Sequence, residues 1–374
     1  MATTTERLLV TYRVRGEAAT IADRAQALAV EQSVEMPLAA IDVPRIATEI
    51  VGAVQAIEDR GGGVFDLRIS LATATMAGPD GPEAGQILNM VFGNSSLHED
   101  VMLWDIDLPA GFAALCGGPH WGIGGLRERL CVGARAITAT ALKPQGLSPD
   151  ELATLAGRLA AGGIDVIKDD HGIADQRYAP FAARVRACAE KIAENAVKTG
   201  HPTRYAPNLS GSLDALRRQV EAARAVGIDL FLIAPFVVGF PAFATIAREN
   251  PDLGFLAHPA MAGAARINPA LLYGKLFRLF GADAVIYPNH GGRFGYTPAI
   301  CREIAAMARG PLAGLAAALP VPAGGMTPAR VAEMLAFYGP DTMLLIGGAL
   351  LSAGPHLVEE TRTFVRAVAE TSHG

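Results

Sequence analysis

From about residue 137 onward, short apolar runs alternate with longer stretches in which apolar residues recur at helical spacing. This alternation is typical of parallel βα units, in which each strand is followed by a helix. The predicted strands are 137–143, 165–170, 204–209, 230–238, 254–258, 284–289, 321–325 and 343–348. Eight such units match the size of one barrel, so we predict a (β/α)8 TIM barrel over residues 126–374. A doubly wound open α/β sheet is the alternative.

Two of the predicted helices carry clear start signals. Ser148-Pro149-Asp150-Glu151 places an N-cap, a first-turn proline and a capping-box glutamate in the order that opens a helix. Thr327-Pro328 opens the helix through Val331 and Met334 in the same way. Each start follows a predicted strand, as the βα pattern requires.

The first part of the chain, residues 1–125, has a different pattern. Alternation of apolar with polar or small residues predicts half-buried strands at 65–72 and, over a shorter run, at 8–14. Residues 21–30 and 44–58 have a helical pattern. We therefore predict a separate N-terminal α+β domain of the ferredoxin-like type, which ends in the glycine-rich loop 117–125.

Composition narrows the class of protein. The net charge of -5, with 18% charged residues, gives no basic surface for nucleic acid. The most apolar stretch, 227–247, is interrupted by Asp229, Pro235 and Pro241, which favours a buried strand and its loop over a membrane span. Four scattered cysteines form no CxxC pair, and the first residues lack a basic and apolar leader, so we expect a cytoplasmic protein.

In a barrel, functional residues lie at the carboxyl ends of the strands. Those positions hold Lys143, Lys168, Asp170, His171, Asn208, His258 and Arg293, and the glycine pairs Gly324-Gly325 and Gly347-Gly348. Side chains alternate along a strand, so Lys168 and Asp170 share one face and Asp169 has the other. The pair is either a buried ion pair or part of a metal site. An ammonium cannot bind a metal, so the second interpretation needs Lys168 to lose its charge or to become an anion, for instance a carbamate.

The other strand ends also leave alternatives open. Glycine pairs after the seventh and eighth strands favour phosphate binding over simple tight turns, because bare backbone N–H groups meet a helix start there. Lys143 is a candidate acid or base, or else a counter-charge for phosphate. His258 is either a polar group of the site or a satisfied core histidine.

These motifs together resemble the large subunit of ribulose-bisphosphate carboxylase (RuBisCO), and more closely its non-carboxylating relatives, the RuBisCO-like proteins. The matching segments are GGIDVIKDDHG at 162–172, ALKPQGLSP at 141–149, FLAHPAM at 255–261, PAGGM at 322–326 and IGGALL at 346–351. In the N-terminal domain, 29–33 and 92–94 resemble the stretches that reach into the partner subunit's active site. The motifs keep the family's order over nearly the whole chain.

The resemblance implies a set of roles. Lys168 would carry carbon dioxide as a carbamate and bind one Mg²⁺ with Asp170 and His171, while Lys143 would move protons and His258 would assist. Glu31 and Asn94 would be donated across a homodimer with shared active sites. Gly324, Gly325, Gly347 and Gly348 would bind the substrate's phosphate.

Several residues depart from the family pattern, and they indicate a different substrate from that of the carboxylase. Gln145 replaces a lysine, Pro259 an arginine, Ala323 a serine, and Ile286 or Tyr287 stands where a histidine is expected. The lysine that a carboxylase needs in the loop 288–296 has no clear match, and Arg293 is the candidate for part of its role. His171 replaces a glutamate, and imidazole suits other metals better than magnesium. The pattern implies a substrate with one phosphate and argues against carbon dioxide fixation.

The KDDHG variant and the GGRF loop look closest to the RuBisCO-like proteins that isomerise 5-methylthioribulose 1-phosphate in sulfur salvage. We therefore expect Mg²⁺-dependent enolisation and isomerisation of that small sugar phosphate. The alternatives are a methylthio-diketone phosphate enolase, or a decarboxylase, transcarboxylase or hydrolase of a β-keto sugar acid phosphate of the 3-oxo-isoapionate 4-phosphate type. A protein of another class, a catalytically inactive phosphosugar-binding scaffold, is opposed by retention of Lys143, Lys168 and Asp170.

Overall fold

The computed structural model describes residues 6–372, so the first five residues, part of the segment in which no leader was found, and the last two lie outside it. The chain divides into two compact units. The first comprises the described residues up to Gly118 together with Gly263–Leu272 and Pro311–Leu315, and the second comprises the remainder. Each is described by itself below.

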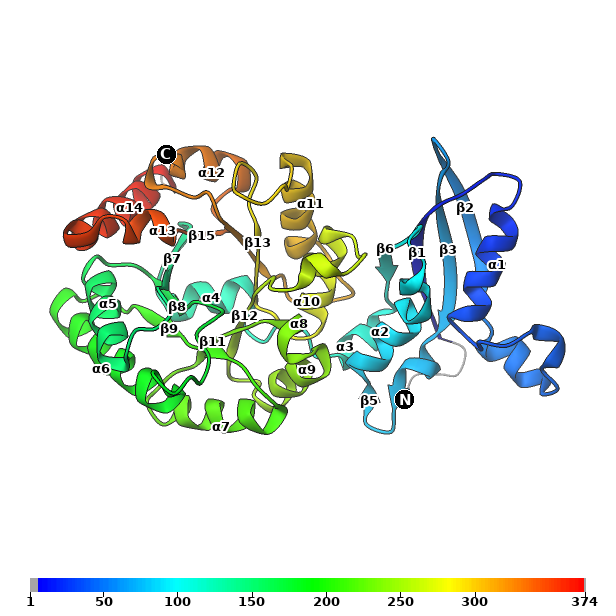
Figure 1. The fold of residues 1–374 in the computed structure, drawn as a ribbon, viewed down its shortest axis with the longest axis horizontal. Coiled ribbons are helices and arrows are strands. Elements are labelled where there is room, and N and C mark those ends of the chain that lie inside the picture. Colours follow the sequence, from blue (N-terminus) through cyan, green and yellow to red (C-terminus); the bar gives the residue numbers. More distant parts are fainter. Residues whose placement is uncertain (1–5, 373–374) are drawn as a thin grey trace. The chain divides into compact units, whose positions relative to one another are not determined.

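The first unit is built on a four-stranded antiparallel sheet in the order β2-β3-β1-β6. Along the chain the main elements are β1 Arg7–Arg15, α1 Ile21–Glu31, β2 Ala53–Gly61, β3 Val64–Ala72, α2 Ala84–Phe92 and β6 Val101–Asp107. Shorter elements are β4 Ala77–Gly78, β5 Gly81–Pro82 and α3 Ala110–Leu115. This βαββαβ arrangement is the predicted ferredoxin-like α+β fold, and Figure 1 shows the three long strands β1, β2 and β3 side by side.

One predicted element of this unit is wrong. Residues 44–58 were expected to form a helix, but only a short π-helical turn, Ile46–Ile50, forms there before β2 begins. Gly52 lies between the two, and a Cβ at that position would lie 2.4 Å from the carbonyl oxygen of Ala29, so only glycine fits there. The hairpin to β3 then turns at three glycines with positive φ, 61–63. Pairing of β2 with β3 therefore overrides the helical pattern of the local sequence.

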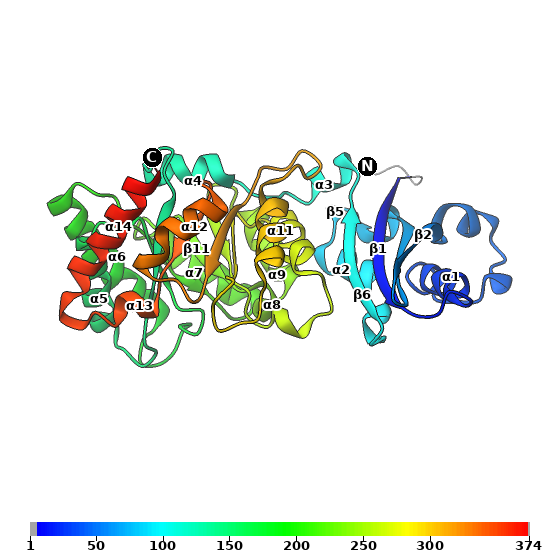
Figure 2. The ribbon, with the colours of Figure 1, turned by 90° about the horizontal axis from the view of Figure 1, so that it is seen from above.

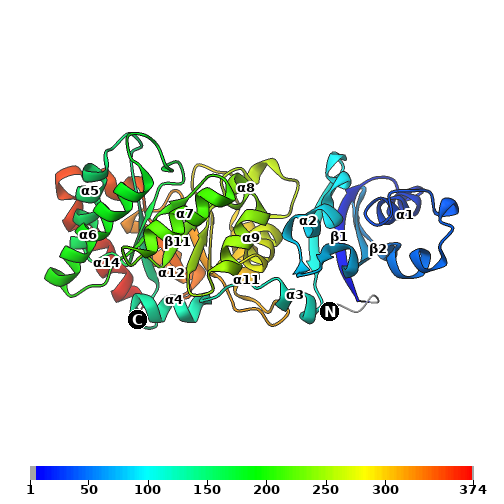
Figure 3. The same ribbon diagram turned by 90° about the horizontal axis from the view of Figure 1, so that it is seen from below.

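Alternate residues of β1 make the buried face of this sheet: Leu8, Val10, Tyr12 and Val14. The hydroxyl of Tyr12 donates a 2.5 Å hydrogen bond to the carbonyl of Val91 near the end of α2. Figures 2 and 3 show α1 beside this sheet in two further views. The unit thus has the single buried sheet face that its alternating sequence predicted.

The second unit is a barrel of parallel strands. Its strands are β7 Ile137–Leu142, β8 Val166–Asp169, β9 Arg204–Ala206, β10 Asn208–Leu209, β11 Leu230–Ile233, β12 Gly254–Ala257, β13 Ala284–Pro288, β14 Leu319–Ala323 and β15 Met343–Leu345. Its helices are α4 Gly122–Leu130, α5 Pro149–Ala161, α6 Phe181–Thr199, α7 Leu213–Arg224, α8 Pro235–Val238, α9 Phe240–Glu249, α10 Phe277–Leu279, α11 Pro298–Arg309, α12 Val331–Tyr338, α13 Gly348–Leu351 and α14 Leu357–Ser372. The strands form a ring surrounded by helices (Figure 1).

The strand order runs from β10 through β11 to β15 and on through β7 and β8 to β9. β9 and β10 are two halves of one strand interrupted at Pro207, whose carbonyl accepts a 3.0 Å hydrogen bond from the Leu232 amide. The ring therefore closes, and the eight strand positions predicted from the sequence are confirmed. The fourth is shorter than predicted, because α8 begins at Pro235 in the segment that was expected to remain extended.

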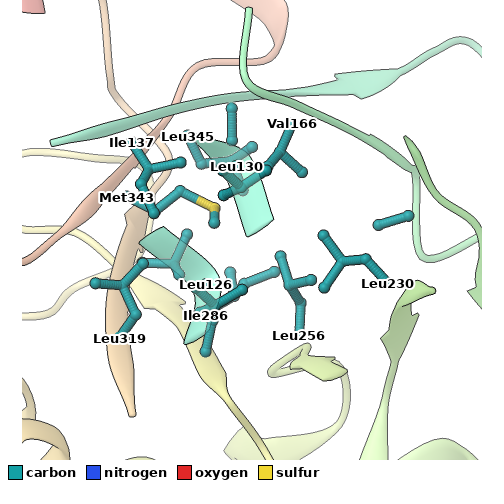
Figure 4. Close-up of a cluster of buried hydrophobic side chains, with 14 of the residues drawn as sticks. Leu126, Leu130, Ile137, Val166, Leu230, Leu256, Ile286, Leu319, Met343 and Leu345 are labelled. Atoms are coloured by element: carbon teal, nitrogen blue, oxygen red, sulfur yellow. The ribbon is translucent and has the colours of Figure 1, made fainter. Parts of the chain in front are cut away.

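The interior of the barrel is filled by apolar side chains from alternate strand positions. Figure 4 shows the labelled side chains of this cluster pointing toward one another. They include Ile137, Val166 and Ile286 from strands, and Leu126 and Leu130 from α4. Since α4 joins the cluster where the strands begin, it closes the amino-terminal end of the barrel.

The helices around the barrel begin where the sequence indicated. Ser148 and Glu151 form both bonds of the predicted capping box at the start of α5. A single 3-10 turn, Pro328–Arg330, opens the helix that continues as α12. Figures 2 and 3 show α5, α6 and α14 together on one side of the barrel. Within residues 6–372, no helix combines the length and the apolar character that crossing a bilayer requires.

Candidate active site at the carboxyl ends of the barrel strands

Strand alternation decides which side chains reach the inside of the barrel at the carboxyl ends of the strands. Ile137 and Ala139 of β7, Val166 of β8 and Leu256 of β12 belong to the interior cluster. The same alternation continues through Ala141 to Lys143 after β7, and it reaches Lys168 and Asp170 after Val166 and His258 after Leu256. Parallel strands thus bring four of the predicted site residues to one end of the barrel.

Asp170 is the centre of this group. Its Oδ1 lies 2.6 Å from Lys143 Nζ and 3.6 Å from His171 Nδ1. Burial by itself raises the pKa of Asp170, but hydrogen bonds from His171 and Lys143 and the nearby charge of Lys168 lower the pKa well below its usual value. The carboxylate is therefore ionised at neutral pH, and positive or donor groups converge on one of its oxygens.

Lys168 is buried, with 3% of its surface exposed, and its Nζ donates a 2.9 Å hydrogen bond to the carbonyl of Asp169. Its pKa is lowered to about 8, chiefly by burial; the charge of Asp170 partly opposes this shift, and the charge of Lys143 adds to it. An amine with this pKa is neutral and nucleophilic in an appreciable fraction of molecules near pH 7 to 8.

His258 has a defined tautomer in this arrangement. Its Nδ1 accepts a 3.1 Å hydrogen bond from the Ala260 amide, so the neutral ring carries its proton on Nε2. Burial, and then the charges of Lys168 and His171, lower the pKa of His258 well below its usual value. Its ring stacks on that of His171 with centroids 4.1 Å apart and planes 14° apart.

A second layer of residues holds the segment that carries Asp170 and His171. Asp169 accepts hydrogen bonds on Oδ1 from the Tyr205 hydroxyl at 2.6 Å, and on Oδ2 from Arg184 Nε at 3.2 Å and the Asn208 amide at 3.0 Å. The side-chain amide of Asn208 donates to the carbonyls of His171 and Ile173 at 3.0 and 2.9 Å. Asp169 thus points away from Asp170, as alternation predicted.

The sequence did not reveal these supports. Asn208 was noted as a strand end but was given no role, and Arg184 and Tyr205 gave no local signal. Arg184 lies on α6, and only the fold brings its guanidinium within 3.1 Å of Asp169. The only signal in the sequence was Asp169 itself, because a carboxylate buried outside the barrel interior must have a charged or hydrogen-bonding partner.

The two glycine pairs adopt different conformations. Gly324 and Gly325 both have positive φ, 86° and 67°, which glycine alone adopts readily. A Cβ on Gly347 would lie 4.0 Å from Lys143 Cε, so the loop after β15 runs beside the predicted proton-transfer lysine. Gly348 begins α13.

The remaining predicted residues lie in two other places. The guanidinium of Arg293 is 4.9 Å from the ring centroid of Phe294, in the loop after β13. In the first unit, Asn94 Nδ2 donates to Glu31 Oε1 at 2.8 Å and to Glu35 Oε1 at 3.1 Å. Glu31 and Asn94 are therefore in contact, with Glu35 as a third member that the sequence had not indicated.

Comparison with known proteins identifies the family. The family model described as the ribulose bisphosphate carboxylase large chain, catalytic domain, matches residues 122–356. Over 366 residues the chain is 56% identical to the 5-methylthioribulose-1-phosphate isomerase of Rhodospirillum rubrum, covering 98% of this chain and 97% of that protein. This chain belongs to the RuBisCO large-chain family.

Two further relatives indicate its branch of that family. A solved structure of a RuBisCO-like protein from Rhodopseudomonas palustris has a TM-score of 0.89 and 48% identity, covering 97% of this chain and 98% of that one. The 2,3-diketo-5-methylthiopentyl-1-phosphate enolase of Geobacillus kaustophilus is 31% identical over 332 residues, 83% of this chain and 80% of that protein. The chain is a RuBisCO-like protein, as the motifs indicated.

The fold clarifies two departures from the RuBisCO pattern. Ile286 belongs to the interior cluster, whereas the Tyr287 ring packs on Tyr338 with centroids 6.4 Å apart, so Ile286 takes the interior position on β13. Gln145 packs over Gly172, where a Cβ would lie 1.8 Å from Gln145 Nε2. Both substitutions put uncharged groups where the resemblance led us to expect cationic or basic ones.

Proposed function

We propose that this RuBisCO-like protein enolises and isomerises 5-methylthioribulose 1-phosphate and does not fix carbon dioxide. The observation that carries the proposal is the convergence of Lys143, Asp170 and His171 at one end of the barrel, beside the buried Lys168. The 56% identity to an isomerase named for that substrate supports this choice among the family's reactions.

The donor set fits a divalent cation if Lys168 is converted to an anion. Among residues 6–372, no three His, Cys, Asp or Glu side chains gather as metal ligands. Asp170 and His171 therefore supply two donors, and the lowered pKa of Lys168 favours the neutral amine that forms a carbamate. We propose that carbamylated Lys168, Asp170 and His171 hold one Mg²⁺.

The reaction needs the carbon-bound proton next to the substrate's ketone to be removed and then returned at another carbon. Bound magnesium would polarise the ketone and its neighbouring hydroxyl. Lys143 would carry protons, since its amine already contacts a site carboxylate at 2.6 Å. His258, neutral with its proton on Nε2, would donate a hydrogen bond to a substrate oxygen that gains negative charge.

Each end of the substrate would have its own surroundings. We propose that the phosphate binds the loops of Gly324-Gly325 and Gly347-Gly348, with Arg293 nearby. The opposite end would meet apolar groups such as Ile286 and Ala323, which belong to or pack against the interior cluster. A methylthio tail suits this environment better than a second phosphate would.

We also propose that the enzyme works in the cytoplasm as a homodimer, with Glu31 and Asn94 completing the partner's active site. Glu31 lines a surface groove of the first unit together with Val30, Glu35 and Met36. The four free cysteines agree with a reducing compartment. Reducing the protein concentration below the dimer dissociation constant should then lower the specific activity.

A proton NMR experiment in D₂O tests the proposal. The enzyme is preincubated with Mg²⁺ and bicarbonate and then mixed with 5-methylthioribulose 1-phosphate. Conversion to an isomer, or deuterium exchange at the carbon next to the ketone, supports the proposal. Absence of both would exclude this substrate.

The same assay separates the alternatives. The enolase relative is only 31% identical, so 2,3-diketo-5-methylthiopentyl 1-phosphate is the second substrate to test. Turnover of a β-keto sugar acid phosphate would identify a decarboxylase, transcarboxylase or hydrolase. An inactive scaffold would bind phosphosugars without exchange, and Lys168→Ala would then leave that binding unchanged.

A further inference from the structure

Two glycine-containing loops pack against each other backbone to backbone at one side of the barrel mouth. A Cβ on Gly325, in the loop after β14, would lie 2.6 Å from Gly292 Cα. A Cβ on Gly292, in the loop after β13, would lie 2.9 Å from the carbonyl oxygen of Gly324. Any side chain at either position would push the loops apart, so their close approach depends on bare backbone.

Arg330 lies at the junction of these loops. Its Nη1 donates a 2.9 Å hydrogen bond to the carbonyl of Gly325. The same guanidinium makes two bonds to Glu333, Nε to Oε2 at 2.9 Å and Nη2 to Oε1 at 2.8 Å. Its terminal nitrogens also come within 3.4 and 3.5 Å of where a Cβ on Gly291 would stand.

The strands beneath the loops are joined as well. The Asn289 amide donates to the carbonyl of Ala323 at 2.8 Å, and the Tyr338 hydroxyl donates to Asn289 Oδ1 at 2.6 Å. The Asn289 side-chain amide lies 3.3 and 3.1 Å from the sulfurs of Met326 and Met334. Arg330 therefore completes, on the surface, a connection that already runs from β13 through β14 to α12.

We propose that Arg330 is a positioning residue for phosphate binding, which fixes the Gly324-Gly325 loop and links it to the loop after β13. This inference rests on the phosphate site of the proposed function. Arg330 acts through the loop and does not itself contact the phosphate. A salt bridge between surface residues three apart would contribute little by itself. The additional bond to the Gly325 carbonyl gives this ion pair a role in the loop's geometry.

Two physical effects follow from that bond. Gly324 and Gly325 have wide conformational freedom, so fixing the loop beforehand removes part of the entropy cost of ordering it around an anion. A hydrogen bond from a cation to the Gly325 carbonyl also polarises its peptide group, which makes the Met326 N–H a stronger donor. Both effects favour anion binding and leave proton transfer near Lys143 unaffected.

The test compares Arg330→Gln, Arg330→Lys and Glu333→Gln with Arg362→Gln, a control in a surface pair of the same spacing on α14. Inorganic phosphate binding is measured by calorimetry, and KM and kcat are measured separately with 5-methylthioribulose 1-phosphate. We expect Arg330→Gln to weaken phosphate binding and raise KM by about tenfold, the loss of one charge-assisted hydrogen bond, while kcat changes less than about threefold. Arg330→Lys should recover part of the loss.

Hydrogen exchange of residues 289–297 supplies a second readout, and faster exchange is expected in Arg330→Gln and Glu333→Gln. If Arg330→Gln proves unstable, Glu333→Gln releases the guanidinium without removing it and should give a smaller change in the same direction. Unchanged phosphate affinity in both variants would overturn the role of Arg330 alone. A wild-type enzyme that binds no phosphate would overturn the phosphate site itself and this inference with it.

Discussion

Lys143 Nζ lies 2.6 Å from Asp170 Oδ1, the same oxygen that His171 Nδ1 approaches to 3.6 Å. The amine of Lys143 therefore occupies Oδ1 of the carboxylate that we propose as a metal ligand. A cation that takes this oxygen as its ligand must displace Lys143, and the movement would free its amine to face the substrate. Metal binding at Oδ1 and release of Lys143, the lysine that we propose for proton transfer, are thus expected to be one event.

Replacing Lys143 with methionine should make metal binding stronger and turnover much weaker. Without the competing amine, Mn²⁺ affinity in bicarbonate-free buffer should rise about tenfold, and turnover should fall at least a hundredfold with loss of the proposed proton carrier. Electron paramagnetic resonance measures the free Mn²⁺. Lys191→Met, which removes a lysine from a surface ion pair, is the control. Equal or weaker Mn²⁺ binding in Lys143→Met would contradict the proposed competition.

Activation by bicarbonate should depend on pH through Lys168. Its pKa is lowered to about 8, chiefly by burial, and only the neutral amine can attack carbon dioxide. The activation rate at fixed dissolved carbon dioxide should therefore rise between pH 7 and pH 8 and level off above pH 9 or so. Lys168→Met should show no dependence on bicarbonate at any pH. Equal activation rates at pH 7 and pH 9 would argue against a carbamate.

The lowered pKa of Lys168 also has a consequence for stability. The unfolded chain holds this proton up to its usual pKa, 10.5, whereas the folded chain releases it at about 8. The unfolded state therefore binds more protons between these values, and the free energy of unfolding should rise with pH across that window. Urea unfolding at pH 8 and pH 10, in wild type and Lys168→Met, should reveal the difference.

Gly325→Ala should damage phosphate binding without unfolding the protein. The new Cβ would lie 2.6 Å from Gly292 Cα, and φ at this position is 67°. We expect KM for the phosphorylated substrate to rise at least tenfold, because the loop must shift by a sizeable fraction of an ångström. Gly295→Ala is the matched control, since no atom lies within 4 Å of its Cβ position. Similar KM values for the two variants would contradict the expectation.

Asp283→Asn should destabilise the barrel from its amino-terminal end. The Asp283 carboxylate accepts hydrogen bonds from the amides of Trp121 at 2.6 Å, Gly122 at 2.8 Å and Phe255 at 2.9 Å. An asparagine would turn its own NH₂ group toward one of these donors. A loss of about 2 kcal/mol in the free energy of unfolding is expected. Guanidinium denaturation measures it, and Asp252→Asn, at an exposed ion pair, should change little.

The contribution of Asp283 to stability depends on pH with the opposite sign to that of a carboxylate whose pKa is lowered by an ion pair. Burial raises the pKa of Asp283 to about 6, although the backbone N–H groups oppose the shift. The folded state therefore binds its proton more tightly than the unfolded state. The contribution of Asp283 to stability should fall as pH rises from about 4 to 6 and stay constant above that.

The sequence predicted the barrel because its strands and helices follow from local periodicity, and the barrel in turn assigned the candidate site to the carboxyl ends of the strands. Alternation along β8 was sufficient to assign Lys168 and Asp170 to one face and Asp169 to the other. Contacts between segments that are distant in the sequence could not be predicted from that periodicity. The helix expected at 44–58 became β2 because pairing with β3 overrode the local pattern, and the contact of Arg184 with Asp169 exists only when α6 lies against the barrel.

The apolar cluster fills the barrel, and Leu126 and Leu130 of α4 extend it at the amino-terminal ends of the strands. In the part of the chain that the structure describes, no passage therefore runs through the ring to the candidate site. Substrate and product must then enter and leave through the same opening, at the carboxyl ends of the strands. A product that leaves slowly blocks the next arrival, so inhibition by the product should be competitive with the substrate. Slow product release would also limit the rate at which the enzyme can turn over.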